Sequence, residues 1–209
     1  MADILTPASP LASLRERFAA LPAAVAIAEE PFLAMADLWV DPAGPGGAAA
    51  REALGFDLPT TPSSSVTVGA TSAIWLGPQE WLVVGRSASP EADLHAAVGA
   101  HGGAAVDVSG QRTTVRLKGS RVRNVLAKGC SIDLHPRVFR AGAAVQTMLG
   151  LAAVILIALD DNGTDYRVLV RASFARYLGE WLLDAAGEFA PHDPGSAPPA
   201  RPPRQLAQW

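Results

Sequence analysis

Residues 107–149 read DVSGQRTTVRLKGSRVRNVLAKGCSIDLHPRVFRAGAAVQTML. Apolar Val115 and Leu117 alternate with polar neighbours, which is the period-two pattern of a half-buried β-strand. A helix with apolar side chains at helical spacing follows, and Ser120 is expected to cap its beginning. Gly129 is expected to end this helix in the left-handed conformation. The stretch therefore predicts a strand, a capped helix and a glycine stop.

Upstream of this stretch, apolar periodicity predicts further helices and strands. The expected elements are a helix over residues 9–21, strands at 25–27 and 32–40, a helix at 48–54, a hairpin at 73–84, a helix at 90–100 and a strand that leads into Asp107. Gly44-Pro45-Gly46-Gly47 is predicted to be a flexible loop that is not a strand-to-helix turn. Residues 58–65, LPTTPSSS, are predicted to be a polar connection without core residues.

Downstream, two strand-like segments at 143–149 and 151–159 precede the turn signal Asp-Asp-Asn-Gly at 160–163. A returning strand is predicted at 166–170. Ser173 is expected to cap a final helix with a broad apolar face, formed by Phe174, Tyr177, Leu178, Trp181, Leu182, Ala185 and Phe189. The proline-rich residues 191–209 show no periodicity and are predicted to form an extended tail.

A hairpin followed by a helix occurs twice in this order of elements. Runs of strands and helices without strict alternation favour an α+β fold over a doubly wound sheet. We therefore predict one α+β domain over residues 1–190, built from two related lobes of antiparallel sheet covered by helices, with a boundary near 104–110.

Composition excludes several classes of protein. The 209 residues carry a net charge of −3 and a pI near 5.8, so no basic surface for nucleic acid is expected. The longest apolar run, 149–159, is shorter than the ~20 residues that span a bilayer, and the N-terminus does not resemble a signal peptide. A single cysteine suits a reducing compartment. We expect a cytoplasmic protein that binds neither membrane nor nucleic acid.

The candidate reactive side chains each have a structural alternative. Cys130 follows Lys128, which could activate a thiol as a nucleophile; the alternative is a buried small residue. His135 could act as a base, or bond to the backbone of its own turn. The four histidines, His95, His101, His135 and His192, show no metal-like spacing, and no phosphate-binding glycine motif is present.

Asp107, Ser109 and Arg112 cluster in DVSGQR. Arg112 could bind a carboxylate, such as the glutamate tail of a folate, but we favour a role for Asp107 and Arg112 in stabilising the turn between two strands. A basic face is expected from Arg121, Arg123, Arg137 and Arg140. Such a face is usually solvated, and the alternative is a docking surface for an acidic partner.

Five tryptophans stand out in a chain that has few aromatic residues. Trp39, Trp75, Trp81 and Trp181 lie in predicted elements, so most of them are expected in the core. Trp209 ends the proline-rich tail, where it is either loose or anchored in a partner.

Three segments together resemble a known family. They are WLGPQEWLVV, DVSGQRTTVRLKGSRVRNVLAKGCSIDLHPRVF and YRVLVRASFARYLGEWLLDAA, and the likeness covers roughly Ala73 to Phe189. In order and spacing they resemble the gamma subunit of heterotetrameric sarcosine oxidase. That family is related in fold to the folate-binding domain of the glycine-cleavage aminomethyltransferase. Such transferases carry a further C-terminal barrel, and we expect no such barrel from the residues that follow Phe189.

The resemblance implies an accessory subunit of a bacterial complex that converts sarcosine to glycine, hydrogen peroxide and 5,10-methylenetetrahydrofolate. It implies partners in the alpha, beta and delta subunits, with FAD, FMN, NAD and zinc held on those subunits and tetrahydrofolate used by the complex. For this chain it implies no cofactor, metal or catalytic residue. The alternative is a stand-alone folate-dependent transferase or regulator that uses Cys130. The sequence KGC resembles a motif of such regulators, but SIDLHP follows it where that family has a tyrosine and then GQE.

Overall fold

The computed structural model describes residues 7–85 and 90–190 of the chain. The predicted tail at 191–209, with Trp209 and His192, lies outside the described residues. The helices are η1 (Ala12–Leu14), α1 (Arg15–Ala19), η2 (Ala23–Val25), α2 (Pro45–Leu54), α3 (Pro90–Val98), η3 (Gly99–His101), α4 (Val122–Ala127), α5 (Ala172–Ala186) and η4 (Gly187–Phe189). The strands are β1 (Ala26–Glu30), β2 (Ala34–Trp39), β3 (Ser65–Val68), β4 (Thr71–Gly77), β5 (Glu80–Gly85), β6 (Ala104–Asp107), β7 (Arg112–Lys118), β8 (Ala144–Leu149), β9 (Ala152–Ala158) and β10 (Asp165–Arg171).

The strands form two five-stranded antiparallel sheets. Sheet A has the order β1-β7-β10-β9-β8, and sheet B has the order β3-β4-β5-β2-β6. The chain passes from sheet A to sheet B after β1 and returns between β6 and β7. The N-terminal strand therefore belongs to the same lobe as the C-terminal half of the chain.

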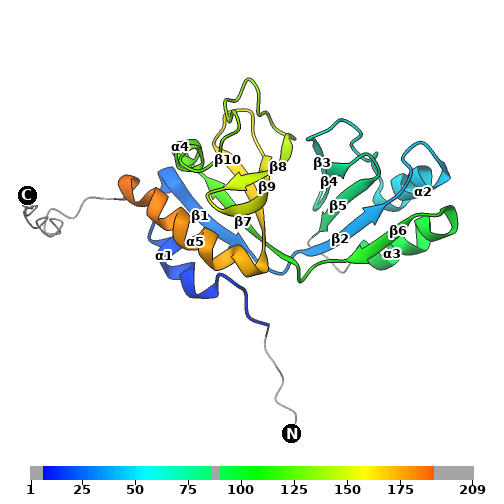
Figure 1. Ribbon diagram of the computed structural model, residues 1–209, viewed down its shortest axis with the longest axis horizontal. Coiled ribbons are helices and arrows are strands. Elements are labelled where there is room, and N and C mark those ends of the chain that lie inside the picture. The colour runs from blue at the N-terminus through cyan, green and yellow to red at the C-terminus, as the bar shows by residue number, and fades with distance from the viewer. Residues whose placement is uncertain (1–6, 86–89, 191–209) are drawn as a thin grey trace, which may run out of the picture.

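Helices cover the outer face of each sheet (Figure 1). Helices α1, α4 and α5 share one apolar cluster with sheet A, and α2 and α3 share a second cluster with sheet B. A third cluster joins the inner faces of the two sheets, and it contains Met35, Ile74, Leu82, Val84, Ala144, Ile155, Ile157 and Leu169. The α+β class and the two helix-covered sheets are confirmed.

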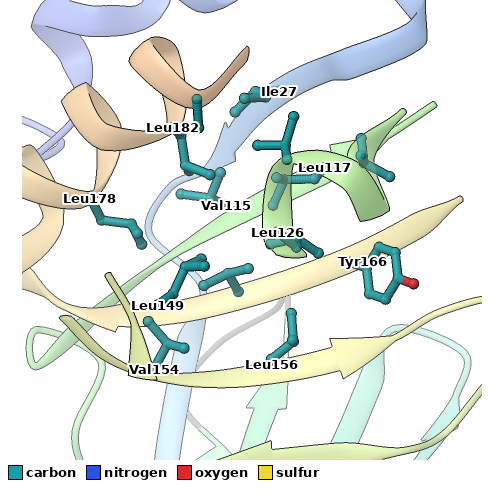
Figure 2. Packing of buried hydrophobic residues seen from close by; sticks show 14 of the residues in the cluster. Ile27, Val115, Leu117, Leu126, Leu149, Val154, Leu156, Tyr166, Leu178 and Leu182 are labelled. Carbon is teal, nitrogen blue, oxygen red and sulfur yellow. The ribbon is translucent and has the colours of Figure 1, made fainter. Parts of the chain in front are cut away.

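The central strands of sheet A show why the sequence folds in this way. Val115 and Leu117 on β7 are fully buried against the helices, near Leu178 and Leu182 of α5 (Figure 2). Their polar neighbours on β7 face the other side of the sheet, as the period-two pattern predicts.

Strand β9 is apolar on both faces because it is buried on both. Val154 and Leu156 pack under the helices, while Ile155 and Ile157 pack against sheet B. The long apolar run that begins at Leu149 therefore comprises the last residue of β8, a turn, and a strand that is buried on both faces from Val154 onward.

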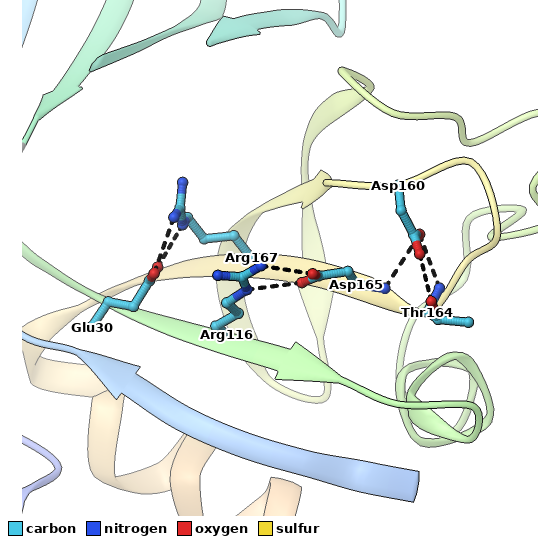
Figure 3. A network of polar contacts seen from close by, with 6 residues as sticks. All are labelled: Glu30, Arg116, Asp160, Thr164, Asp165 and Arg167. Atoms are coloured by element: carbon cyan, nitrogen blue, oxygen red, sulfur yellow. Dashed lines mark hydrogen bonds and ion pairs between the residues drawn. The ribbon is translucent and has the colours of Figure 1, made fainter. Parts of the chain in front are cut away.

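Arginines and carboxylates occupy part of the inner face of sheet A (Figure 3). Arg116 Nε and Nη2 donate to Asp165 at 2.9 and 2.7 Å, and Arg167 Nε and Nη2 donate to Glu30 at 2.6 and 3.1 Å. Each guanidinium thus binds a carboxylate through two parallel hydrogen bonds, the strongest geometry for this pair.

The serine caps predicted for two helices are wrong. Arg121 and Arg171 are the N-cap residues of α4 and α5, and neither helix has a side-chain cap bond. Backbone carbonyls take the place of the serines: Arg121 N–H donates to Ala24 O, and Ala172 N–H donates to Gln111 O, both at 2.9 Å. Segments distant in the sequence therefore bind backbone donors where both helices begin.

The left-handed stop predicted at Gly129 is also wrong, because this residue does not have a positive φ. Its lack of a side chain serves packing instead. A Cβ at this position would lie 2.4 Å from Trp181 Cζ2 and 2.9 Å from Gly150 N. Gly129 thus lets α5 approach the β8–β9 turn closely.

Two predictions before the hairpin are wrong. Helix α2 begins at Pro45, so Gly46 and Gly47 belong to a helix that follows β2 rather than to a flexible loop. Proline suits the first turn of a helix, and a Cβ on Gly47 would lie 2.3 Å from Pro42 O. The connection at 58–65 also contributes to the core, because Leu58 is buried and Pro59 O accepts a hydrogen bond from Trp81 Nε1 at 2.8 Å.

Candidate functional site

The turn between β6 and β7 is held by Asp107 and Ser109. Asp107 Oδ1 accepts hydrogen bonds from Ser109 N–H at 2.9 Å and from the Ser109 hydroxyl at 2.5 Å. These donors lower the pKa of Asp107. The Ser109 hydroxyl oxygen also accepts from Met35 N–H at 2.9 Å, which ties the turn to β2. The predicted turn role of Asp107 is confirmed.

Arg112 also bonds to this turn, because its guanidinium donates a hydrogen bond to the side-chain oxygen of Gln111. It is the first residue of β7, and the alternation of the strand places its side chain on the inner face of sheet A. Arg112 lies directly opposite Arg171 of β10 in the antiparallel register. Burial and the charge of Arg171 lower the pKa of Arg112, while Asp37 and Glu80 act in the opposite direction.

A hollow of about 370 Å³ lies beside these two arginines. Ala153 of β9 and Met148 of β8 continue the row that Arg112 and Arg171 begin across sheet A. The small side chain of Ala153 leaves space between the arginine and the methionine. The sequence missed Arg171 as a site residue, because only the strand register places it beside Arg112.

Two carboxyl groups of sheet B, Asp37 and Glu80, lie near enough to influence Arg112. Burial raises the pKa of Asp37, against a hydrogen bond from Trp39 and the charge of Arg112 that lower it. Burial and the charge of Asp37 raise the pKa of Glu80. Because the folded-state pKa of each group exceeds its unfolded value, their ionisation as pH rises destabilises the fold, and protonation at acid pH removes that cost.

Cys130 is buried, with 8% of its surface exposed, and packs in the helix-side cluster of sheet A. The Lys128 ammonium is engaged by groups other than the Cys130 thiol. The Lys128 ammonium donates to Ala185 O at 2.5 Å, pairs with Glu188 at 2.8 Å and lies 5.3 Å from the centre of the Phe189 ring. The geometry thus matches the prediction of a buried small residue rather than an activated nucleophile.

His135 bonds within its own turn, as predicted. The imidazole Nδ1 accepts a hydrogen bond from the backbone N–H of Arg137 at 3.1 Å, and the backbone N–H of His135 donates to Asp133 Oδ1 at 2.8 Å. A hollow of about 300 Å³ lies beside this turn and is lined by Arg123, Asn124, Ala127, Ile132, Asp133, Leu134 and His135. Arg121, Arg137 and Arg140 of the predicted basic face are exposed, and Arg123 is half-buried.

Among residues 7–85 and 90–190, no three His, Cys, Asp or Glu side chains come close enough to hold an ion. The glycines that open α2 serve close packing, because a Cβ on Gly46 would lie 2.6 Å from Val40 Cγ2. Across the same described ranges, no helix has the length and apolarity that a membrane crossing requires.

Several large apolar side chains are exposed, although the sequence predicted core positions for some of them. Phe174 and Tyr177 belong to the apolar stripe of α5, yet 45% and 37% of their surfaces are exposed. Trp39 is 51% exposed, whereas Trp81 is fully buried. Trp75 and Trp81 are a cross-strand pair, as the hairpin pattern predicts.

Comparison with known proteins gives a consistent set of relatives. The sarcosine oxidase, gamma subunit family matches residues 39–188. "Sarcosine oxidase subunit gamma" of Corynebacterium sp. (strain U-96) is 34% identical over 169 residues, which cover 80% of this chain and 82% of that protein. The protein of the same name from Corynebacterium sp. (strain P-1) is 37% identical over 151 residues, covering 71% and 73%.

Solved structures agree in fold. A chain of the heterotetrameric sarcosine oxidase from Corynebacterium sp. U-96 superimposes with a TM-score of 0.82 at 32% identity, covering 90% of this chain and 98% of that chain. The glycine cleavage system aminomethyltransferase T from Bartonella henselae gives a TM-score of 0.52 at 13% identity. That alignment covers 81% of this chain but only 48% of the transferase, and it shows a shared fold alone.

Proposed function

This chain belongs to the sarcosine oxidase gamma subunit family, and from that membership we propose that it is the gamma subunit of a heterotetrameric sarcosine oxidase. The complex would oxidise the N-methyl group of sarcosine with oxygen as the electron acceptor, which is reduced to hydrogen peroxide, and would release glycine and transfer the one-carbon unit to tetrahydrofolate. One observation carries the proposal: the fold matches a sarcosine oxidase chain over nearly the full length of both, at 32% identity.

The proposed role within the complex is structural. The candidate reactive groups are engaged in the fold itself: Asp107 and Ser109 hold a turn, His135 bonds to backbone, and Cys130 is buried in the core. The alpha, beta and delta subunits would then hold FAD, FMN, NAD and zinc and bind the substrates. The complex would work in the cytoplasm.

Replacing Cys130 by serine tests this role against a transferase or regulator that depends on the thiol. Serine is close to cysteine in size but a far weaker nucleophile at neutral pH. We expect the purified complex that carries Cys130→Ser to assemble normally, with wild-type kcat and KM for sarcosine, measured as hydrogen peroxide release. Placing a hydroxyl in the core lowers the stability of the chain by about 1–3 kcal/mol.

Cys130→Ala serves as the control, because it removes the sulfur without adding a polar group. Thermal unfolding of both variants separates lost stability from lost chemistry. If both variants assemble with all subunits yet lose activity, Cys130 takes part in the chemistry and the structural role is wrong.

A further inference from the structure

The inner face of sheet A holds two pairs of facing arginines, which differ in whether their guanidinium groups bind carboxylates. Arg116 lies opposite Arg167, and Arg112 lies opposite Arg171, on the same two strands β7 and β10. In the first pair each guanidinium binds its own carboxylate, Asp165 or Glu30, through two hydrogen bonds (Figure 3).

The second pair has no such carboxylate. Among the described residues, no acidic oxygen lies within the 4.0 Å ion-pair distance of the Arg112 or Arg171 guanidinium. Arg112 donates a hydrogen bond only to its neighbour Gln111, a neutral amide. The charges of Asp37 and Glu80 on sheet B act on Arg112, but from beyond ion-pair distance.

Two like charges that face each other across neighbouring strands destabilise a sheet. Burial strengthens the repulsion, because Arg112 is only partly in contact with water. The chain offsets this cost at Arg116 and Arg167 with carboxylates of its own. At Arg112 and Arg171 an acid from outside the chain would make the same two-pronged contact.

The surroundings of Arg171 are typical of a protein interface. Met148 is 46% exposed on the same row of sheet A, and Leu151 in the β8–β9 turn is 75% exposed. The exposed Tyr177 hydroxyl accepts a hydrogen bond from Leu151 N–H at 3.0 Å, so the start of α5 adjoins this turn. Arginine, methionine and aromatic side chains are enriched in subunit interfaces.

We propose that Arg112 and Arg171, flanked by Met148 and Leu151, dock an aspartate or glutamate side chain of another subunit of the oxidase complex. The proposal rests on the proposed function and adds the surface by which the chain binds its partners. The acid of the other subunit binds in the hollow above Ala153. Apolar groups of that subunit, beside the acid, cover Met148 and Leu151. The site lies at the end of sheet A where β7 begins and β10 passes into α5.

Charge reversal within the complex tests this surface. The tagged chain is produced together with the other subunits of its oxidase, captured by its tag, and the recovered subunits are quantified by mass together with sarcosine-dependent hydrogen peroxide. We expect Arg171→Glu to raise the Kd for the other subunits at least about tenfold, as loss of an interfacial charge pair does. The same change at exposed Arg137, on the loop before β8, is the matched control and is expected to leave Kd unchanged.

Arg171→Gln separates docking from folding. Because it removes one of two facing like charges, the variant chain is expected to unfold at the wild-type temperature or above it, while its Kd still rises. Arg171→Lys keeps the charge but loses the planar guanidinium that makes two parallel hydrogen bonds. Its Kd for the other subunits is expected to lie between the values for wild type and Arg171→Gln.

Three results would overturn the docking surface. Unchanged Kd in Arg171→Glu and in the double variant with Arg112→Glu would remove it. A loss with Arg137→Glu alone would move docking to the basic face beside α4. Normal assembly with a raised KM for sarcosine or tetrahydrofolate would assign the arginines to a small carboxylate ligand instead. If the wild-type chain captures no sarcosine-oxidising complex, the proposed function itself fails.

Discussion

Replacing Trp81 by alanine is expected to lower the free energy of unfolding by about 3–5 kcal/mol, the range for large aromatic side chains deleted from a core. Trp81 is fully buried in the cluster that joins sheet B to α2 and α3. Its Nε1 also donates to Pro59 O, so the variant leaves that carbonyl without its donor. Urea unfolding followed by far-UV circular dichroism measures the loss.

Trp39→Ala is the matched control on the same sheet. Half of the Trp39 surface is already exposed, so the variant loses less buried surface than Trp81→Ala, together with the hydrogen bond to Asp37. We expect a cost of about 1 kcal/mol. Equal losses at the two positions would contradict the assignment of Trp81 to the core and Trp39 to the surface.

An aspartate at position 82 is expected to be more damaging still, with a loss above about 4 kcal/mol. Leu82 is fully buried in the cluster between the two sheets. It lies directly opposite Asp37 on β2, so the new carboxylate would be desolvated and placed next to a like charge. Chemical denaturation at pH 7 measures the effect.

Leu82→Met keeps the volume and the apolar character of the side chain, and we expect it to cost less than about 1.5 kcal/mol. Acid pH provides a second check. Burial raises the pKa of the introduced aspartate, so its penalty shrinks as pH falls through that value. A small loss for Leu82→Asp would mean that the two sheets do not pack face to face in solution.

Much of the fold follows from periodicity in the sequence. The alternation of β7, the hairpin of β4 and β5, and the Asp-Asp-Asn-Gly turn before β10 all form where their patterns predict. Each of these signals is local, because alternation and turn chemistry act over a few residues. The resemblance to the sarcosine oxidase gamma subunit is confirmed, since it depends on the order of these same segments.

The wrong predictions concern contacts between distant segments. Ser120 and Ser173 have the chemistry of helix caps, yet the N-caps are Arg121 and Arg171, and distant carbonyls (Ala24 O and Gln111 O) accept hydrogen bonds where the two helices begin. Gly129 is needed for the approach of Trp181, which lies more than fifty residues away in the sequence. The local propensity of a sequence carries no information about contacts between such distant segments.

At the candidate site, too, local contacts could be predicted from the sequence and long-range contacts could not. The bonds of Asp107 and His135 were predictable, because their partners lie within two residues. The pairing of Arg112 with Arg171 was not, because it depends on the register of β7 with β10. Only that register shows that one facing arginine pair has carboxylate partners and the other does not.

We propose that this chain acts as a structural subunit of a sarcosine oxidase. The most direct test of this proposal is to tag the chain in its native host, isolate it under native conditions, and determine the mass and subunit composition of the isolated species together with sarcosine-dependent hydrogen peroxide release. We expect a stable heterotetramer, as in the sarcosine oxidase from Corynebacterium sp. U-96, that contains one copy of this chain and three other subunits. The isolated complex is expected to release hydrogen peroxide when sarcosine is added. Recovery of the chain alone, or of an active chain without partners, would contradict the claim.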